Sequence, residues 1–377
     1  MSHFVVLGGG LVGRVMALDL AGDHGSRVTV ADRDEQQLAR LASEGLATRR
    51  LDLSDVAAVK AAVADADVVV GAAPGHLGFR VLRAVIEAGK PIADIAFMPE
   101  NFLELDPLAR ERGVTAVVDC GVAPGLSNLL CGRAASLFEH TERMLILVGG
   151  LPKRRVWPYE YRIVFSAVDV IEEYTRPARW VEHGKLVVKP ALTDPEPVDL
   201  PRVGTLEAFN TDGLRSLALT LKAPFMKEKT LRYPGHIEKM RMLRETGFFS
   251  HEPIVLRGGQ EVRPFDLTTK LLFDAWKLPE GDADLTVMRV EVEGTIGGAR
   301  KTYTWDLYDE YDPQTRYTSM ARTTGYPNAI VARMLASGEL KRPGVSPPEL
   351  LASDQRLFDR MVEGLKQRRV ELTLTVA

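Results

Sequence analysis

The sequence predicts an α/β protein that combines a doubly wound parallel sheet with an α+β domain whose mixed sheet is largely antiparallel. Within the first 120 residues, short apolar runs alternate with amphipathic stretches, as strands and helices do around a parallel sheet. Beyond about residue 125 the pattern changes to a proline-punctuated segment and then to long runs in which apolar and polar residues alternate. We therefore expect two domains with different types of sheet.

The first predicted domain is built from strands that lack polar alternation. Its expected strands are residues 4–7, 28–31, 67–71, 91–95 and 114–119. Its expected helices are residues 11–20, 35–42, 56–64, 77–88 and 100–110. Strands that are apolar on both faces must be covered on both faces, and β-α-β crossovers are right-handed, so these elements predict a doubly wound sheet.

The second predicted domain starts with a segment that prolines interrupt too often for a continuous helix or a central strand. These prolines are Pro177, Pro190, Pro195, Pro197 and Pro201. Further on, residues 285–296 and 300–311 alternate between apolar and polar and flank Gly297-Gly298, a pattern typical of a two-residue hairpin. Two helices at 327–336 and 354–368 and a strand at 370–375 are expected near the C-terminus.

The composition excludes several classes of protein. The chain has 377 residues, of which 45% are hydrophobic and 26% charged, and a formal net charge of −3. It contains neither a long basic cluster nor an apolar run of about 18–20 residues, which argues against nucleic-acid and membrane partners. The two cysteines, Cys120 and Cys131, exclude a disulfide framework and favour a cytoplasmic location. No histidine has the spacing of a zinc site, so we expect no metal.

The strongest motif lies directly after the first strand. Residues 8–13 read Gly-Gly-Gly-Leu-Val-Gly, in which Gly8 permits a tight turn, Gly10 leaves room for a pyrophosphate, and Gly13 lets helix and strand approach. Leu11 and Val12 start the helix, whose N-terminus offers N–H groups to the phosphates. This strand–turn–helix context predicts a Rossmann dinucleotide-binding domain.

A second set of residues bears on the choice of dinucleotide. Asp32 ends the second strand, 24 residues after Gly8, where a carboxylate accepts hydrogen bonds from a ribose diol and repels a 2′-phosphate. NAD is therefore favoured over NADP, although the guanidinium of Arg33 offers either a phosphate contact or stacking on adenine. Asp52 is expected either to contact adenine or to belong to a helix N-cap region in which Ser54 is the better cap. Further candidates for cofactor binding are Leu53, Ala72, Ala73 and Pro74.

Asp94, Asp119 and Cys120 follow or end the next two predicted strands. The carboxyl ends of parallel strands line the ligand crevice of an open sheet, and buried acids there can transfer protons at neutral pH. We favour Asp94 as the catalytic candidate, because Cys120 also reads as a small buried hydrophobe. Structural hydrogen bonds are the alternative role for each of these residues.

Two polar motifs lie in the second domain. In residues 207–215, Asp212 reads as a helix cap, whereas Arg215 offers a planar fork to a substrate carboxylate. Residues 231–236 end a strand and begin a helix, and His236 there can act as an acid or a base or fill a structural role. The neighbouring polar candidates for substrate contact are Asn210, Thr211, Asp212 and Tyr233.

With these residues in view, the chain resembles the saccharopine dehydrogenase-like family, and within it the lysine 6-dehydrogenase branch. The resemblance rests on residues 8–13, 119–128, 206–214, 231–236 and 320–327. It covers nearly the whole chain, and the segments 123–128 and 320–327 are the most specific. It implies that a late segment closes the Rossmann domain, which places residues 1–125 with 318–340 in the first domain and 126–317 with 341–377 in the second.

The resemblance also implies an activity. Saccharopine reductases of the family carry a tyrosine just after the proline of the fourth strand, where this chain has Gly75-His76, so that role is either lost or passed to His76. They also carry an aspartate where this chain has Ala123, and both departures favour lysine over saccharopine. The implied reaction is NAD-dependent oxidation of the lysine ε-amine to the semialdehyde and ammonia, carried out by a homodimer. Asp94, His76 or His236 would transfer protons, Arg215 would bind the α-carboxylate, and Thr324 would join the substrate contacts. The alternatives are another amino acid, imine or carboxylated polyamine as substrate, or an NAD sensor without turnover.

Overall fold

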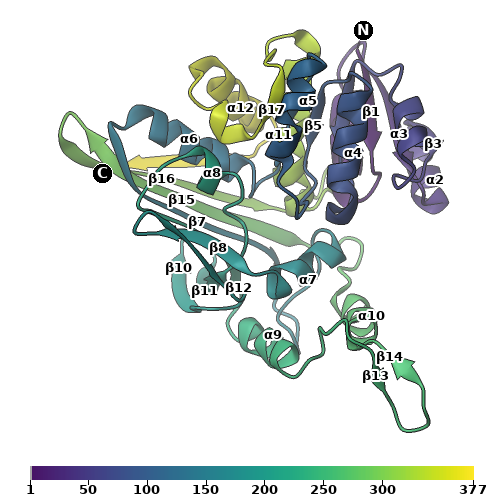
Figure 1. Ribbon diagram of the computed structural model, residues 1–377, viewed down its shortest axis with the longest axis vertical. Coiled ribbons are helices and arrows are strands. Elements are labelled where there is room, and N and C mark those ends of the chain that lie inside the picture. Colours follow the sequence, from purple (N-terminus) through teal and green to yellow (C-terminus); the bar gives the residue numbers. More distant parts are fainter. Residues whose placement is uncertain (1) are drawn as a thin grey trace. The chain divides into compact units, whose positions relative to one another are not determined.

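The computed structural model describes residues 2–377 and divides into two compact units, each described here by itself (Figure 1). The first unit contains residues up to 138 together with 321–372, and the second contains 139–320 together with 373–377. The expected division differs from this one at its boundaries: residues 126–138 and 341–372 belong to the first unit, and residues 318–320 belong to the second. Across residues 2–377, no helix is long and apolar enough to cross a membrane.

The first unit contains a seven-stranded sheet in the order β17-β6-β5-β4-β1-β2-β3, with every neighbouring pair parallel. Its strands are β1 (His3–Leu7), β2 (Arg27–Asp32), β3 (Ala47–Arg50), β4 (Val68–Gly71), β5 (Ile92–Asp94), β6 (Thr115–Val117) and β17 (Gly344–Ser346). The central strands β1 and β4 are buried along their whole length, as their uninterrupted apolar sequences require. The order reverses at β1, which creates a crevice at the carboxyl ends of β1 and β4. The predicted doubly wound sheet is confirmed.

The helices of this unit follow the sequence pattern closely, except late in the chain. They are α1 (Leu11–Ala21), α2 (Glu35–Ser43), α3 (Val56–Ala62), α4 (Gly75–Glu87), α5 (Asp106–Glu111), α6 (Leu126–Leu137) and α12 (Gln355–Gln367), with 3-10 turns at Phe102–Leu105 and Pro348–Leu350. The helix expected at 327–336 is α11 (Ser319–Ser337), which starts earlier and contains Pro327 in its interior. The earlier start has a cause in the second unit, where the Asp284 carboxylate accepts hydrogen bonds from the Ser319 and Met320 amides at 2.7 and 3.0 Å.

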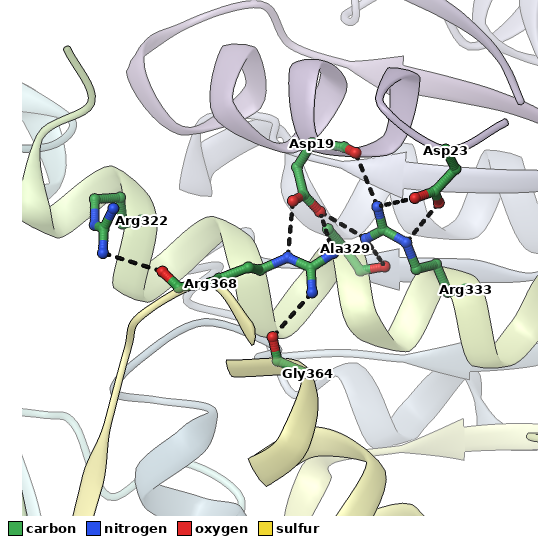
Figure 2. A network of polar contacts seen from close by, with 7 residues as sticks. All are labelled: Asp19, Asp23, Arg322, Ala329, Arg333, Gly364 and Arg368. Carbon is green, nitrogen blue, oxygen red and sulfur yellow. Dashed lines mark hydrogen bonds and ion pairs between the residues drawn. The ribbon is translucent and has the colours of Figure 1, made fainter. Parts of the chain in front are cut away.

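Ion pairs hold the late segment of the chain onto α1 (Figure 2). Arg333 on α11 reaches Asp19 at 2.6 Å and Asp23 at 2.6 Å, and Arg368 reaches Asp19 at 2.7 Å. Gly325 on the same helix packs so closely that an added methyl would lie 3.1 Å from Met16. Helix α11 is therefore fixed against α1, the helix that follows the glycine motif.

The second unit contains a nine-stranded sheet whose main path is β10-β11-β12-β7-β15-β16-β18. Its strands are β7 (His140–Pro152), β8 (Ala178–Glu182), β9 (Lys185–Lys189), β10 (Glu196–Leu200), β11 (Gly204–Asn210), β12 (Phe225–Arg232), β15 (Asp284–Ile296), β16 (Ala299–Glu310) and β18 (Leu372–Val376). The hairpin predicted around Gly297-Gly298 is confirmed as β15 and β16, which pair from Leu285↔Glu310 to Ile296↔Ala299. Only β12 and β7 pair in parallel among the named pairs, so the sheet is mixed and largely antiparallel, as predicted.

The second unit contains short helices and an aromatic core of its own. The helices are α7 (Ala167–Thr175), α8 (Leu217–Thr220), α9 (His236–Glu245) and α10 (Pro264–Trp276), and a short hairpin, β13 (Ile254–Val255) with β14 (Glu261–Val262), precedes α10. Tyr161, Tyr174 and Trp276 lie together in this core, with ring centroids 5.4 Å apart for Tyr161 and Trp276. His236, the first residue of α9, lies against all three of these rings.

Candidate functional site

The glycine motif has the close contacts that a dinucleotide-binding turn needs. A methyl group added to Gly8 would lie 2.4 Å from the carbonyl oxygen of Ala72, and one added to Gly13 would lie 1.9 Å from that of Gly8. Gly10, by contrast, has no atom within 4 Å of its would-be methyl, so the surface above it is open. Gly10 is also the N-cap of α1 and provides no side-chain cap to the helix amides. The turn can therefore present amide groups to a pyrophosphate at close range.

Asp32 lies at the carboxyl end of β2, where the adenosine ribose would bind. Its Oδ2 accepts a hydrogen bond from the Gly9 amide at 2.6 Å, and its Oδ1 accepts one from the Asp34 amide at 2.9 Å. These two bonds fix the carboxylate beside the glycine turn, and each oxygen keeps a lone pair for a ribose hydroxyl.

An open hollow of about 510 Å³ adjoins this position and is lined by Arg33, Asp34, Arg50, Leu51 and Asp52. Hydrogen bonding to Ser54 and the nearby charge of Arg33 lower the pKa of Asp52, so this carboxylate is ionised at neutral pH. Ser54 is not the cap of the next helix: the Asp55 carboxylate accepts from the Ala57 and Ala58 amides. The adenine contact of Asp52 stays a prediction, and Leu53 is buried.

The end of β4 is formed by small residues, as the cofactor hypothesis requires. The Ala72 carbonyl packs against Gly8, Ala73 is buried, and Pro74 is the N-cap of α4. His76 lies in the first turn of α4 and is exposed. Its proposed part in proton transfer stays a prediction.

A pair of buried acids follows the next two strands. Asp94 at the end of β5 is 2% exposed, and its Oδ1 accepts a hydrogen bond from the Ala96 amide at 3.0 Å. The carboxyl group lies against the end of β4, since a methyl added to Gly71 would be 2.3 Å from Oδ1. Burial, reinforced by the charge of Asp119, raises the pKa of Asp94 to about 7. Such a group exchanges a proton near neutral pH and is suited to general acid–base chemistry.

Cys120 lies beside these acids but does not share their chemistry. Its thiol is buried, and burial together with the charges of Asp94 and Asp119 raises its pKa far above neutral. The thiol is therefore not a nucleophile or proton carrier at neutral pH, and Cys120 fits the small-hydrophobe interpretation. Asp119 itself is buried with a positive φ of 51°. Thr324, on α11 in the same unit, packs its methyl 3.2 Å from where a methyl on Gly121 would lie.

In the second unit, residues 210–215 form a buried polar turn that several side chains hold in place. The amide of Asn210 donates to Thr193 and Asp194 at 3.1 and 2.9 Å. The carboxylate of Asp212 accepts two hydrogen bonds from Arg179 at 2.7 and 2.8 Å. The expectation that Asp212 caps a helix is wrong, because Ser216 is the N-cap of α8 and Arg179 neutralises Asp212 instead.

The same turn ends at Arg215 and is supported from β12. Arg215 is buried and has a positive φ of 51°, a conformation that few residues with side chains adopt. Thr211 and the Gly213 amide both donate to one carboxylate oxygen of Glu228, the latter at 3.1 Å. Glu228 does not stand out in the sequence, because it lies between Lys227 and Lys229 and such a run of charges reads as a solvent-exposed strand.

His236 is enclosed in the aromatic core and is 0% exposed. Its Nδ1 lies 2.6 Å from the Tyr159 carbonyl oxygen and its Nε2 lies 2.9 Å from the Tyr174 hydroxyl, so both ring nitrogens are engaged. Burial and the nearby charge of Arg232 lower the pKa of His236 to about 3. These surroundings keep the ring neutral and favour the structural role over that of an acid or base.

Two other members of the 231–236 motif are also structural in their contacts. The Tyr233 hydroxyl donates to the Pro152 carbonyl at 3.0 Å, and Arg232 forms a buried ion pair with Glu173. These contacts stabilise the fold. The role of Tyr233 in substrate binding stays a prediction.

Comparisons with known proteins identify the family of the chain. Residues 4–117 match the model of the saccharopine dehydrogenase NADP-binding domain, and residues 121–370 match that of the saccharopine dehydrogenase C-terminal domain. Among curated proteins, the L-glutamate-forming saccharopine dehydrogenase of Schizosaccharomyces pombe is 24% identical, covering 99% of this chain and 98% of the relative. The carboxynorspermidine synthase of Vibrio cholerae is 23% identical, covering 92% of each chain.

Solved structures show the same fold. Apo saccharopine dehydrogenase (L-Glu forming) from Saccharomyces cerevisiae superimposes with a TM-score of 0.82 at 20% identity and covers all of both chains. The homospermidine synthase of Legionella pneumophila, solved in complex with NAD, has a TM-score of 0.66 at 13% identity, covering 99% of this chain and 91% of that one.

Proposed function

Because the chain belongs to the saccharopine dehydrogenase family, we propose that it oxidises the ε-amine of L-lysine with NAD to 2-aminoadipate 6-semialdehyde and ammonia. The broader class is established by the family: the chain is an NAD(P)-dependent oxidoreductase acting on an amino acid or amine. The observation that carries the proposal is Asp94, a buried acid with a pKa of about 7 at the carboxyl edge of the dinucleotide-type sheet.

Residues of the first unit would bind the dinucleotide and take up the proton. Gly8, Gly10 and Gly13 would hold the pyrophosphate, and Asp32 would hold the adenosine ribose. When bound, the nicotinamide supplies a hydride acceptor. Asp94 in its ionised form would take a proton from the substrate ammonium, because only the neutral amine can expel a hydride from its carbon.

Water then completes the reaction on the substrate. Loss of the hydride leaves an iminium, and addition of water to its carbon with loss of ammonia yields the semialdehyde. The overall change consumes the lysine ammonium form, NAD and water, and it releases the aldehyde, ammonium, NADH and one proton. Arg215 would bind the α-carboxylate, which lies at the end of the substrate remote from the reacting carbon.

The choice of NAD over NADP rests on Asp32. A fixed carboxylate accepts from both ribose hydroxyls and repels a 2′-phosphate. Arg33 and Arg50 favour the alternative, since both line the open hollow next to Asp32 and could neutralise a phosphate. Comparing kcat/KM for NAD and NADP in the wild type and in Asp32→Asn tests this proposal. The proposal is overturned if the wild type prefers NADP.

A second candidate function is oxidation or reduction of a carboxylated polyamine or of another amino-acid-derived imine. The similarity to carboxynorspermidine synthase over 92% of the chain favours it, because the name of that relative gives a carboxylated polyamine as its product. One experiment separates the candidates: absorbance of the reduced nicotinamide is followed with L-lysine, saccharopine and carboxynorspermidine, with either dinucleotide. Turnover of lysine with release of ammonia is expected. Turnover of another substrate alone overturns the lysine proposal, and dinucleotide binding without turnover of any substrate supports a sensor.

A further inference from the structure

Glu228 is a buried acid for which the proposed chemistry has no use. It lies on β12 and is 4% exposed, between the half-buried Lys227 and the buried Lys229. One of its oxygens, Oε2, accepts hydrogen bonds from both the Thr211 hydroxyl and the Gly213 amide. Burial raises its pKa to about 8, in spite of these two donors. Burying a carboxyl group costs free energy, so we expect Glu228 to have a specific structural or functional role.

The contact between Glu228 and the turn is also sterically tight. A methyl group added to Gly213 would lie 2.3 Å from Oε2 and 2.3 Å from Cδ of Glu228. Distances this short leave no space between turn and carboxyl group, so any displacement of one is transmitted to the other. Arg215 follows two residues later in the same turn and is itself held in a left-handed conformation.

We propose that Glu228 is a positioning residue for the turn 210–215 and, through it, for the guanidinium of Arg215. This inference rests on the proposed function, in which Arg215 binds the α-carboxylate of the amino-acid substrate. Asn210 and Asp212 are anchored separately, by Asp194 and by Arg179. Glu228 holds the turn at Thr211 and Gly213, the latter two residues before Arg215, and thereby sets the direction in which the chain leads into Arg215.

The proposal predicts a distinctive kinetic effect. Arg215 binds a carboxylate that does not change during the reaction, so its displacement weakens ground state and transition state alike and raises KM without lowering kcat. Removing the support in Glu228→Ala should raise the KM for the amino-acid substrate about tenfold, the effect of losing one good hydrogen bond. The KM for the dinucleotide should be unchanged.

Glu228→Gln is the matched control. Both donors bond to a single carboxylate oxygen, and the amide oxygen of glutamine can accept both in the same place. This variant should therefore keep KM within about twofold of the wild type. If Glu228→Ala does not fold, Thr211→Val, which removes one of the two donors, should raise the same KM severalfold.

A double-mutant cycle with Arg215→Gln decides between positioning and general support of the fold. If Glu228 acts through Arg215, adding Glu228→Ala to Arg215→Gln should leave KM within about twofold of the Arg215→Gln value. Equal additional effects in both backgrounds, a fall in kcat, or a rise in the KM for the dinucleotide would overturn the proposal. If wild-type protein does not oxidise lysine, the proposed function fails separately, and the same cycle is run with whichever carboxylated amine is turned over.

Discussion

The role given to Asp94 leads to a prediction in which activity and stability change in opposite directions. Asp94→Asn keeps the size of the side chain and an oxygen that can accept from the Ala96 amide, but an amide cannot take up the proton that the mechanism removes from the substrate. If Asp94 is the general base, kcat should fall by about 10²–10⁴-fold, the usual contribution of such a group. The pH dependence of kcat should lose the ionisation near pH 7.

The stability effect follows from the pKa of the same group. A rise of the Asp94 pKa from 3.8 to about 7 corresponds to about 4 kcal/mol of preference for the neutral form in the folded state. Because the pKa is raised in the folded state, the wild-type free energy of unfolding is highest below pH 3.8, where Asp94 is neutral in both states. It decreases as the pH rises from 3.8 toward 7 and gains nothing back from Asp94 above that. Asparagine never ionises, so the variant should match the wild type near pH 4 and exceed its free energy of unfolding by about 2–4 kcal/mol near pH 8.

Urea unfolding at these two pH values checks the prediction on stability, and kcat measured at several pH values checks the prediction on catalysis. The matched control is Asp52→Asn, also beside the dinucleotide-type sheet, whose exposed carboxylate has a lowered pKa and should give no gain at high pH. Full turnover with an unchanged pH profile in Asp94→Asn would refute the catalytic role. Equal stability of variant and wild type near pH 8 would refute the reasoning from burial.

Three further predictions concern cofactor binding, the buried histidine and the late helix. Gly13→Ala should weaken NAD binding at least about tenfold, measured by calorimetry, because its methyl would lie 1.9 Å from the Gly8 carbonyl oxygen; an unchanged Kd would contradict the geometry of the turn. His236→Gln should leave the pH profile of kcat unchanged, since the wild-type pKa is about 3, while lowering the free energy of unfolding by about 1–3 kcal/mol; loss of an ionisation near pH 7 would restore a catalytic role. Arg333→Met should lower that free energy by about 2 kcal/mol by breaking the ion pairs of Figure 2, whereas Arg356→Met, at a residue 83% exposed, should change it by less than about 0.5 kcal/mol; equal effects would show that the pairing on α1 adds no stability.

Much of the fold is readable from local sequence because local rules govern it. Apolar runs without alternation predict the buried strands β1 and β4, and alternation around two glycines predicts the hairpin of β15 and β16. The dinucleotide turn is likewise predictable, because three glycines at fixed spacing satisfy a steric requirement within one strand–turn–helix unit. These features depend on residues that are close together in the chain.

The incorrect expectations involve partners that are distant in the chain. Asp212 reads as a cap until Arg179 is brought next to it, and His236 reads as a titrating residue until the aromatic core closes around it. The early start of α11 depends on Asp284, and the assignment of the C-terminal residues depends on β17 pairing with β6. Local propensity contains no information about such contacts.

The sequence by itself therefore determined the two types of sheet, the dinucleotide-binding turn and the family of this protein. The tertiary structure decided which ionisable side chains are usable, because burial and the charges of distant neighbours set each pKa. Burial and neighbouring charges leave Asp94 able to exchange a proton near pH 7, and they keep His236 neutral and Cys120 protonated. The tertiary structure also brought Glu228 beneath the turn that leads to Arg215, a contact between strand and turn that no sequence spacing encodes.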